Sequence, residues 1–357
     1  MAVERPTGMR VAVGQFADMT DDMLRYAAQL GVRGVQMNSP HIPGDGRWEV
    51  ADLRALVDKA AEYGLALEAL ENVPLPWLHE IMIGSEGADT QLENYKATIR
   101  NMGEAGIPIL GYNFMPNSVW RTGRATPGRG QAAVTSFDLS MVEADPDGGR
   151  QYMPGRADWV DGLVLRTDPA EFIEADRMWA NYERFMSEVL PVARDSGVKL
   201  ALHPDDPPVP MLGGVARLFA SPDGFKKAEQ IAESVDGGQA WGLDLCLGST
   251  SEMAGGADDV AEMIDHFGPT GRILYVHFRD VQGTVPKFAE CFIGEGNYDA
   301  AATMLRLKRN GFTGFLLDDH VPHMEGDSGW NHRGRAHAVG YMLGLLDMID
   351  TLDPAAA

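Results

Sequence analysis

The feature that most constrains the fold is a unit that recurs eight times along the 357 residues. Each unit is a short apolar or β-branched run, then a turn, then a stretch with helical hydrophobic period. Eight alternations of strand and helix favour a closed parallel (β/α)8 barrel, an α/β TIM-barrel fold, over an open doubly wound sheet. No glycine-rich dinucleotide fingerprint follows the first strand, which further weakens the open-sheet alternative. The predicted strands are residues 10–15, 34–38, 66–71, 107–114, 199–204, 240–245, 273–281 and 314–320.

Amphipathic stretches separate these strands. Glycine suits the left-handed position that closes a helix, and five helices are predicted to end at Gly31, Gly64, Gly106, Gly197 and Gly311. The predicted helices are residues 21–30, 51–63, 91–105, 178–196, 225–235, 260–267, 298–310 and 333–348.

One segment interrupts the alternation. Residues 115–176 are rich in Gly, Pro, Arg and Asp and show little periodicity. They follow the fourth predicted strand, whose carboxyl end lies on the active-site face of a barrel. We therefore interpret residues 1–357 as a single TIM-barrel domain, with 115–176 as an inserted lid or oligomer contact.

Charge and cysteine content exclude several kinds of partner. Acidic residues outnumber Lys and Arg by 52 to 30, the net charge is −22, and no basic stripe is visible. Nucleic acids and anionic membranes are therefore poor candidates for partners. No apolar run reaches the roughly 20 residues of a membrane span, and the polar N-terminus has no signal-like apolar region. With only Cys246 and Cys291 there is no disulfide framework, so a reducing, cytoplasmic location is expected.

Potential metal ligands occur at the carboxyl ends of four consecutive predicted strands. These residues are His203, Cys246, His277 and Asp319. Taken singly, each has a structural explanation: a hydrogen-bonded histidine, a small buried cysteine, or an aspartate at a helix N-cap. Four such coincidences at successive strands are less plausible than one divalent-metal site. The donor set suits Zn2+, Fe2+, Co2+ or Mn2+.

Longer motifs surround these residues. They are the stretches 93–108, 112–116 and 120–122, the sequence HPDDPP at 203–208, the sequence HFR at 277–279 and the sequence DH at 319–320. In this order, from about Leu65 to the C-terminal helix, the chain resembles the mannonate dehydratases. HPDDPP is the most specific of these motifs.

The resemblance implies a xylose-isomerase-like TIM barrel that acts as a homo-oligomer and binds Mn2+ through His203, Cys246, His277 and Asp319. It implies a lyase of hexuronate catabolism that removes water from the sugar acid D-mannonate and gives 2-keto-3-deoxy-D-gluconate. His320 matches the family's acid/base histidine. Asn113 and Arg279 match polar groups that bind the substrate.

One position departs from the family pattern. Counting back from Arg335, Trp330 stands where the family has a catalytic tyrosine. An indole N–H donates a hydrogen bond but does not exchange protons near neutral pH. We therefore predict that His332 is a second catalytic residue and that Trp330 binds the substrate.

Two other functions remain open at this stage. The first is a metal-dependent sugar isomerase or epimerase of the xylose-isomerase-like group, in which Trp330 stacks on a sugar. The second is a non-catalytic sugar-acid or metal-binding protein. DNA-repair endonucleases of the same broad group conflict with the acidic charge.

Overall fold

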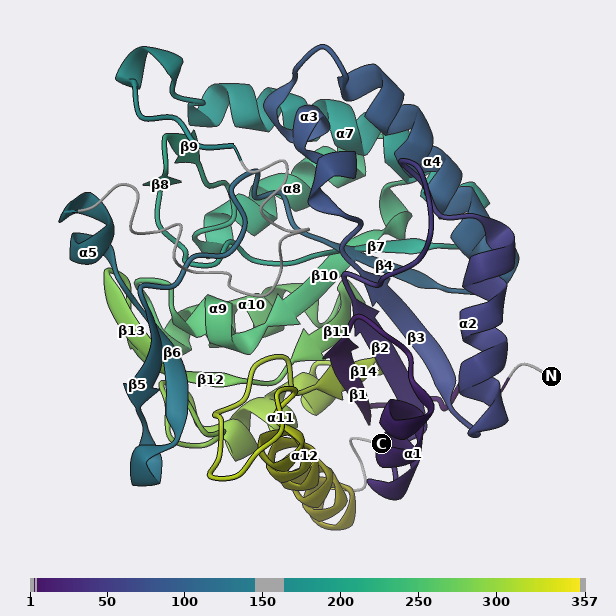
Figure 1. Ribbon diagram of the computed structural model, residues 1–357, viewed down its shortest axis with the longest axis vertical. Helices are drawn as coiled ribbons and strands as arrows, with labels where there is room; N and C mark the ends of the chain where they lie inside the picture. The colour runs from purple at the N-terminus through teal and green to yellow at the C-terminus, as the bar shows by residue number, and fades with distance from the viewer. Residues whose placement is uncertain (1–2, 4, 145–163, 354–357) are drawn as a thin grey trace.

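A computed structural model shows a closed barrel of eight parallel strands surrounded by helices (Figure 1). It describes residues 3, 5–144 and 164–353. The barrel order is β1-β14-β11-β10-β7-β4-β3-β2, so the open-sheet alternative is excluded. The barrel strands are β1 (Arg10–Phe16), β2 (Gly34–Asn38), β3 (Ala66–Glu71), β4 (Ile109–Tyr112), β7 (Lys199–Leu202), β10 (Trp241–Cys246), β11 (Ile273–His277) and β14 (Phe315–Leu317).

The outer layer consists of helices whose apolar faces pack on the barrel. Each predicted helix is present, with at least one end shifted from the predicted residue. No helix among the described residues is long and apolar enough to cross a membrane. The longer helices are α1 (Asp21–Gln29), α2 (Val50–Glu62), α4 (Ala88–Ala105), α7 (Ala175–Asp195), α8 (Pro222–Ser234), α10 (Ala257–Phe267), α11 (Ala300–Arg309) and α12 (His332–Leu352). Short ones are α3 (His79–Ile83), α5 (Leu139–Ala144), α9 (Leu247–Ser251) and the 3-10 turns η1 (Leu75–Trp77), η2 (Arg129–Gln131), η4 (Pro169–Glu171) and η5 (Gly238–Ala240).

The barrel interior is filled by side chains, which makes it a packed core. The large inner side chains come from the neighbouring strands β11 and β14, where the Tyr275 and Phe315 rings stack with centroids 4.9 Å apart. Space is tight at Gly111 on β4, where a Cβ atom would clash with the Tyr275 hydroxyl and with Glu71. The inner residues are Ala12, Ala69, Ala201, Tyr275, Phe315 and Leu317.

Four barrel strands are shorter than predicted, namely β4, β7, β11 and β14. The strand predicted at 273–281 leaves the barrel after His277, where the Phe278 N–H bonds to the Leu317 carbonyl, and a new strand begins at Asp280. The strand predicted at 314–320 ends at Leu317. After β11 and after β14 the chain turns away from the barrel, so the residues that follow each strand lie at the rim.

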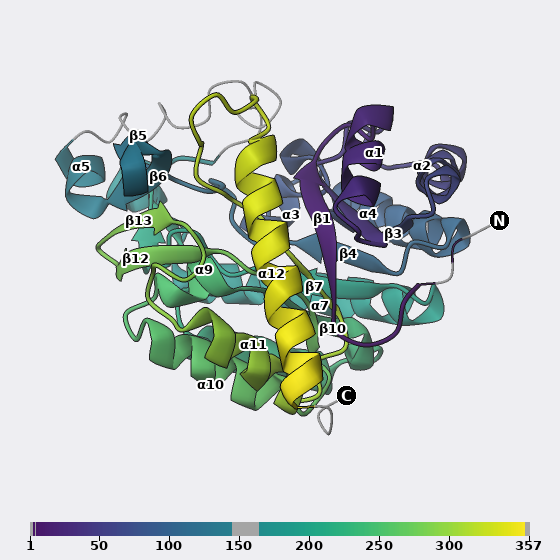
Figure 2. The same cartoon turned by 90° about the horizontal axis from the view of Figure 1, so that it is seen from below.

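The segment 115–176 contains regular structure that the sequence did not reveal. Its strands β5 (Gly123–Pro127) and β6 (Ala133–Asp138) join β13 (Lys287–Cys291) and β12 (Asp280–Thr284) in an antiparallel sheet of order β12-β13-β6-β5. This sheet stands beside the barrel (Figure 2). Of the segment 115–176, interpreted as a lid or oligomer contact, residues 145–163 lie outside the described residues. A small two-stranded sheet, β8 (Met211–Leu212) and β9 (Val215–Ala216), follows β7.

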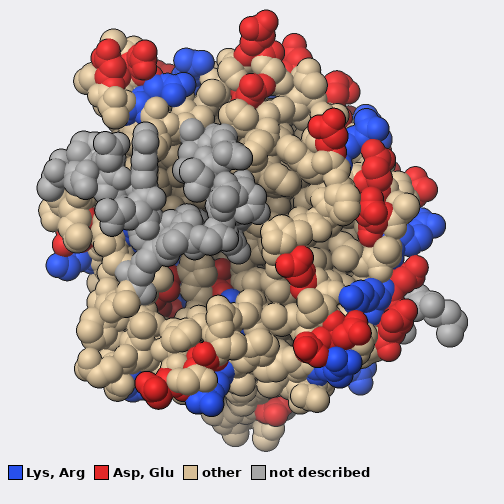
Figure 3. Space-filling view, in the orientation of Figure 1, with Lys and Arg blue, Asp and Glu red and all other residues tan. Residues whose placement is uncertain are grey.

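Acidic and basic side chains are interspersed over the described part of the face in Figure 3. Many of the exposed ones pair across neighbouring elements, as Arg306 does with Asp265 at 2.5 Å.

Candidate metal centre

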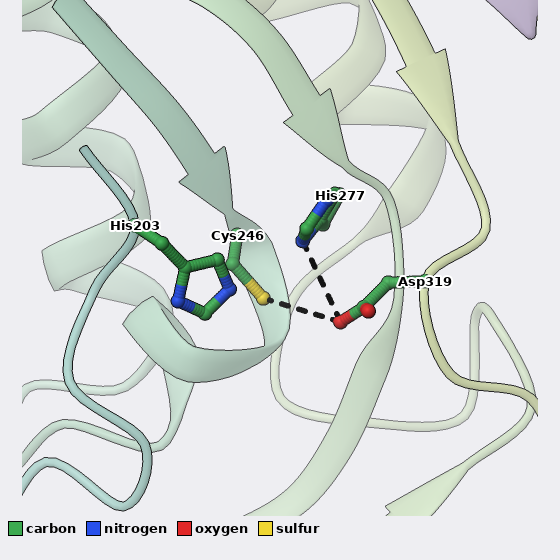
Figure 4. A group of neighbouring side chains, drawn as sticks. All are labelled: His203, Cys246, His277 and Asp319. Carbon is green, nitrogen blue, oxygen red and sulfur yellow. Dashed lines mark hydrogen bonds and ion pairs between the residues drawn. The ribbon is translucent and has the colours of Figure 1, made fainter. Parts of the chain in front are cut away.

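Four potential ligands converge at the carboxyl-terminal rim of the barrel. His203 follows β7, Cys246 ends β10, His277 ends β11, and Asp319 lies two residues past β14. These four strands are neighbours in the barrel. One ligand atom from each residue lies within 4.8 Å of the others, and the side chains point toward a common centre (Figure 4).

The separations between ligand atoms match those around a single ion. Cys246 Sγ is 3.9 Å and His277 Nδ1 is 3.6 Å from Asp319 Oδ2. Metal bonds of about 2.0–2.3 Å place neighbouring ligands roughly 3–4 Å apart. His277 Nδ1 is buried and has no hydrogen-bond partner among the described residues, as expected of a nitrogen that faces a cation.

Contacts behind the histidines select which nitrogen faces the centre. His203 Nδ1 lies 2.7 Å from the Pro204 carbonyl, so the N–H is at Nδ1 and Nε2 is the free acceptor. His277 is reversed, because its Nε2 lies 3.2 Å from Glu71 and 3.5 Å from Asp244. These buried carboxylates orient the imidazole, and the sequence analysis did not identify either of them.

The surroundings of the Cys246 thiol favour its ionised form. Burial acts against the thiolate, but the Arg279 guanidinium and the His203 and His277 rings outweigh burial and hold the pKa of Cys246 well below its usual value. Its sulfur also accepts the Ser249 N–H at 3.3 Å, at the start of α9. A thiolate is the form that binds metal.

Asp319 occupies an unusual backbone position. Its φ is 42°, a left-handed conformation that costs a non-glycine residue roughly 1–2 kcal/mol. Burial disfavours its charge, yet the His320, His277 and Arg279 side chains hold the pKa of Asp319 far below the usual value. The strained turn directs a charged carboxylate to the centre.

Arg279 does not have the placement expected of a substrate ligand. It is 1% exposed, and its Nε donates to Asp319 at 2.9 Å. Its terminal nitrogens donate at 3.0 Å to both Glu252 and Asp206. The guanidinium is thus paired with buried carboxylates, whose charge it compensates.

His320 lies at the open edge of the site. Its side chain is 41% exposed, and its Nδ1 is 2.7 Å from Glu290 Oε1 on β13. Burial opposes protonation, but the Asp319 and Glu290 carboxylates raise the pKa of His320. Glu290 is another residue that the sequence analysis missed, because it belongs to the sheet outside the barrel.

Trp330 lies two residues before α12 and His332 is the first residue of that helix. Both side chains pack against neighbouring aromatic rings. The Trp330 indole packs edge-on against Phe16 and Tyr26, with centroids 6.1 and 5.8 Å away, and its N–H donates to the Gln15 carbonyl at 3.1 Å. His332 stacks edge-on against Tyr26 at 4.9 Å. Its Nδ1 contacts Ser328 Oγ at 2.5 Å. These contacts give both residues structural partners.

Asn113 is one member of a chain of carboxamides along the rim. It donates to Asn72 at 2.9 Å, Asn72 donates to Asn38 at 3.1 Å, and Asn38 donates to Gln15. The Gln15 amide nitrogen also donates to Glu71 at 3.3 Å, and Glu71 lies 3.2 Å from His277 Nε2. Hydrogen bonds therefore connect the ends of β4, β3, β2 and β1 to a ligand of the metal site.

The residues present fit a divalent transition metal. Two imidazoles, a thiolate and a carboxylate are a suitable donor set for such an ion, and the histidines have hydrogen-bonded outer partners. His277 Nδ1, which has no hydrogen-bond partner in the part of the chain that the structure describes, is available to a cation at this point. A second group of possible ligands, Glu71, Asp244 and His277, shares the same imidazole.

Comparison with known proteins agrees with this architecture. The D-mannonate dehydratase (UxuA) family model matches residues 9–354. Mannonate dehydratase 2 of Halalkalibacterium halodurans is 29% identical, covering 96% of this chain and all of that protein. A mannonate dehydratase of Thermotoga neapolitana is 30% identical over 90% of this chain and 92% of its own.

A solved structure is also similar. The crystal structure of mannonate dehydratase from Streptococcus suis serotype 2 superposes with a TM-score of 0.80 and 26% identity, covering 96% of this chain and 95% of that one. An L-ribulose 3-epimerase, 16% identical with a TM-score of 0.57 over 98% of both chains, shares the fold alone. Because the family model spans nearly the whole chain, this protein belongs to the D-mannonate dehydratase (UxuA) family.

Proposed function

We propose that this protein is a metal-dependent hydro-lyase that converts D-mannonate to 2-keto-3-deoxy-D-gluconate and water. The observation that carries the proposal is the convergence of His203, Cys246, His277 and Asp319, with His320 open to the rim beside them. Family membership supplies the substrate class.

The reaction requires removal of the proton beside the substrate carboxylate and protonation of the departing hydroxyl. We assign Mn2+ as the resident ion, held by the four ligands. When bound, the ion would supply positive charge beside the carboxylate and so lower the cost of the negative charge that develops there.

His320 is the proposed proton-transfer group. The Nδ1 of His320 lies 2.7 Å from Glu290 Oε1, so its Nε2 is the nitrogen available to a substrate. Glu290 is fixed in turn by Arg121, 3.3 Å away. This resembles the carboxylate–histidine pairs that set ring orientation in other enzymes. We assign no proton transfer to His332 or Trp330, since their polar atoms are engaged by Ser328 and by the Gln15 carbonyl.

Assaying the Mn2+-loaded protein with D-mannonate tests the function. We expect a 2-keto-3-deoxy acid, a loss of about 100-fold or more in kcat for His320→Asn, and a change below about threefold for His332→Gln. Epimerisation of neutral sugars without loss of water would instead identify an epimerase. Binding of D-mannonate without turnover would identify a non-catalytic protein.

We further propose that residues 1–357 act as one barrel unit, with 115–176 as an insertion, and that the protein is a cytoplasmic homo-oligomer. The β6–β13 pairing supports the first point, because it ties the insertion to a loop of the barrel. Sedimentation of the purified protein tests the oligomeric state.

A further inference from the structure

A cavity of about 100 Å3 lies between the loops that follow β2, β3 and β4. We infer that this cavity, which we call the distal pocket, binds the uncharged hydroxylated end of the sugar acid and rejects a second carboxylate there. The inference rests on the proposed function and adds which substrates the site selects. The lining residues that carry the argument are Ser39, Asn72, Val73, Leu75, Asn113 and Ser118.

The distal pocket is within reach of a substrate held at the metal centre. β4 is the barrel neighbour of β7, the strand that carries His203, and β3 is the next strand along. Strands are spaced about 4.8 Å apart, so the pocket begins roughly 5–10 Å from the ligands. A six-carbon chain with bonds of about 1.5 Å spans roughly 6–7 Å between its end carbons, before its terminal oxygens are counted.

Ser118 supplies a buried hydroxyl to the distal pocket. Ser118 is 5% exposed, and its Oγ has no hydrogen-bond partner among the described residues. A buried hydroxyl without a partner is unfavourable, and a ligand hydroxyl in the pocket removes that cost. This atom is the clearest sign that the distal pocket is completed by a ligand.

The carboxamide of Asn113 adds directional polar groups. Its Nδ2 donates one hydrogen to Asn72, and a carboxamide nitrogen carries two. Its Oδ1 accepts the Met115 N–H at 3.1 Å, which fixes the direction of the amide. The remaining N–H and the oxygen lone pairs suit alcohol groups, which donate and accept.

The backbone around the distal pocket is strained in a way that fits a binding site. Ser39, Asn72 and Ser118 have φ values of 46°, 59° and 59°, although none is glycine. Such conformations are retained where the fold determines them, and they concentrate at ligand sites. All three belong to loops at the rim, beyond the strand ends.

The lining explains why a second carboxylate is rejected. None of its residues is Lys or Arg, and much of its wall is apolar, including Val73 and Leu75. The titratable lining residue, His41, is exposed and lies 3.1 Å from Asp18. A buried carboxylate without a cation is strongly unfavourable, whereas a hydroxyl needs only the neutral groups present. The volume, close to that of three waters, suits a terminal CH2OH and its neighbour.

Substrate analogues test the selectivity on the Mn2+-loaded protein. We expect kcat/KM for D-mannonate to exceed that for its C6-oxidised dicarboxylate by about 100-fold or more. We also expect a four-carbon aldonate to bind more weakly than D-mannonate, because it cannot reach the distal pocket. Equal turnover of the mono- and dicarboxylates would overturn the inference, while absence of D-mannonate turnover would overturn the proposed function instead.

Variants test the pocket itself through binding, measured by calorimetry as well as by turnover. Ser118→Ala should weaken D-mannonate binding about three- to tenfold and leave binding of the four-carbon aldonate unchanged. Ser85→Ala is the matched control, because Ser85 also has a buried hydroxyl without a partner among the described residues but does not line the pocket. Equal D-mannonate binding by the two variants contradicts the inference.

A variant that introduces a positive charge gives a result that does not depend on Ser118→Ala folding well. Leu75 lines the pocket and is only partly buried, so Leu75→Arg places a cation there. The preference for D-mannonate over the dicarboxylate should fall about tenfold or more. An unchanged preference in a folded, metal-loaded Leu75→Arg protein also overturns the inference.

Discussion

At the scale of single residues, Arg279 influences the charge state of the site from a buried position. It lies within a group of buried carboxylates and beside a thiol, where its charge favours the ionised form of each. A buried arginine of this kind is expensive unless every donor has a partner. The ion pairs with Asp319, Asp206 and Glu252 meet that requirement.

The depressed pKa of Cys246 gives a spectroscopic prediction. In the metal-free protein, we expect about one thiolate per chain near pH 7, although an unperturbed cysteine ionises near pH 8.5. Cys246→Ser should abolish the ultraviolet absorbance of the thiolate. Cys291→Ser should leave it unchanged, because burial raises the pKa of Cys291. A thiolate that appears only above pH 8.5 would contradict the proposed electrostatic environment.

Glu290 gives a prediction on pH-dependent stability. Burial alone would raise the pKa of Glu290, but His320 and Arg121 lower it from 4.5 to about 2. A carboxylate with a lowered folded-state pKa stabilises the protein above its unfolded-state value, and this stabilisation is lost as pH falls from 4.5 toward 2. The lost contribution between pH 7 and pH 3 is roughly 2 kcal/mol.

Urea unfolding of the metal-free wild type and Glu290→Gln measures this effect. The wild type should be the more stable protein at pH 7, and the difference should narrow by roughly 2 kcal/mol at pH 3. A difference that does not depend on pH would show that the Glu290 carboxylate is not stabilised by charge. Glu295→Gln is a control on the same side of the molecule, with a partly exposed carboxylate.

At the scale of elements, the loop before α12 fastens the last helix to the first strand. Trp330 packs against Phe16 and Tyr26 and bonds to the Gln15 carbonyl, while the Arg335 guanidinium lies 4.4 Å from its ring. Figure 2 shows α12 running alongside β1. A sequence position that suggested chemistry therefore has a packing role in the structure.

Two substitutions separate the packing of Trp330 from its hydrogen bond. We expect Trp330→Ala to destabilise the protein by about 2–4 kcal/mol through lost contacts. Trp330→Phe should cost about 1 kcal/mol, because it keeps a ring and loses mainly the N–H donor. Thermal unfolding measures both, and a large loss of kcat in a fully folded Trp330→Phe protein would argue for a catalytic role.

At the scale of the whole molecule, closure of the barrel assembles the metal centre. The ligands are separated by up to 116 positions in sequence, between His203 and Asp319, yet their strands are neighbours. The centre therefore exists only in the folded chain, and an ion that binds there stabilises the fold.

Metal removal gives the corresponding prediction. At a free Mn2+ concentration 100 times the Kd, binding adds about 2.7 kcal/mol, which raises Tm by about 3–4 °C for a chain of this length. Chelation should reverse the shift, and His203→Ala and Asp319→Ala should respond little to Mn2+. An equal shift in these variants would place the ion elsewhere.

The sequence alone determined the alternation of strands and helices, and with it the barrel. Hydrophobic runs and glycine helix ends act over a few residues, so β2 and β3 have the predicted bounds. The spacing also placed Cys246 and His277 at strand ends, where neighbouring parallel strands bring their side chains to one rim.

Only the tertiary structure decided the partners of those ligands. Glu290 comes from an antiparallel sheet that joins β6 and β13, and Glu71 reaches His277 across the barrel. The role of Arg279 and the packing of Trp330 likewise depend on residues distant in sequence. The physical reason is that burial and electrostatic environment are properties of the assembled fold, whereas periodicity is a property of the local chain.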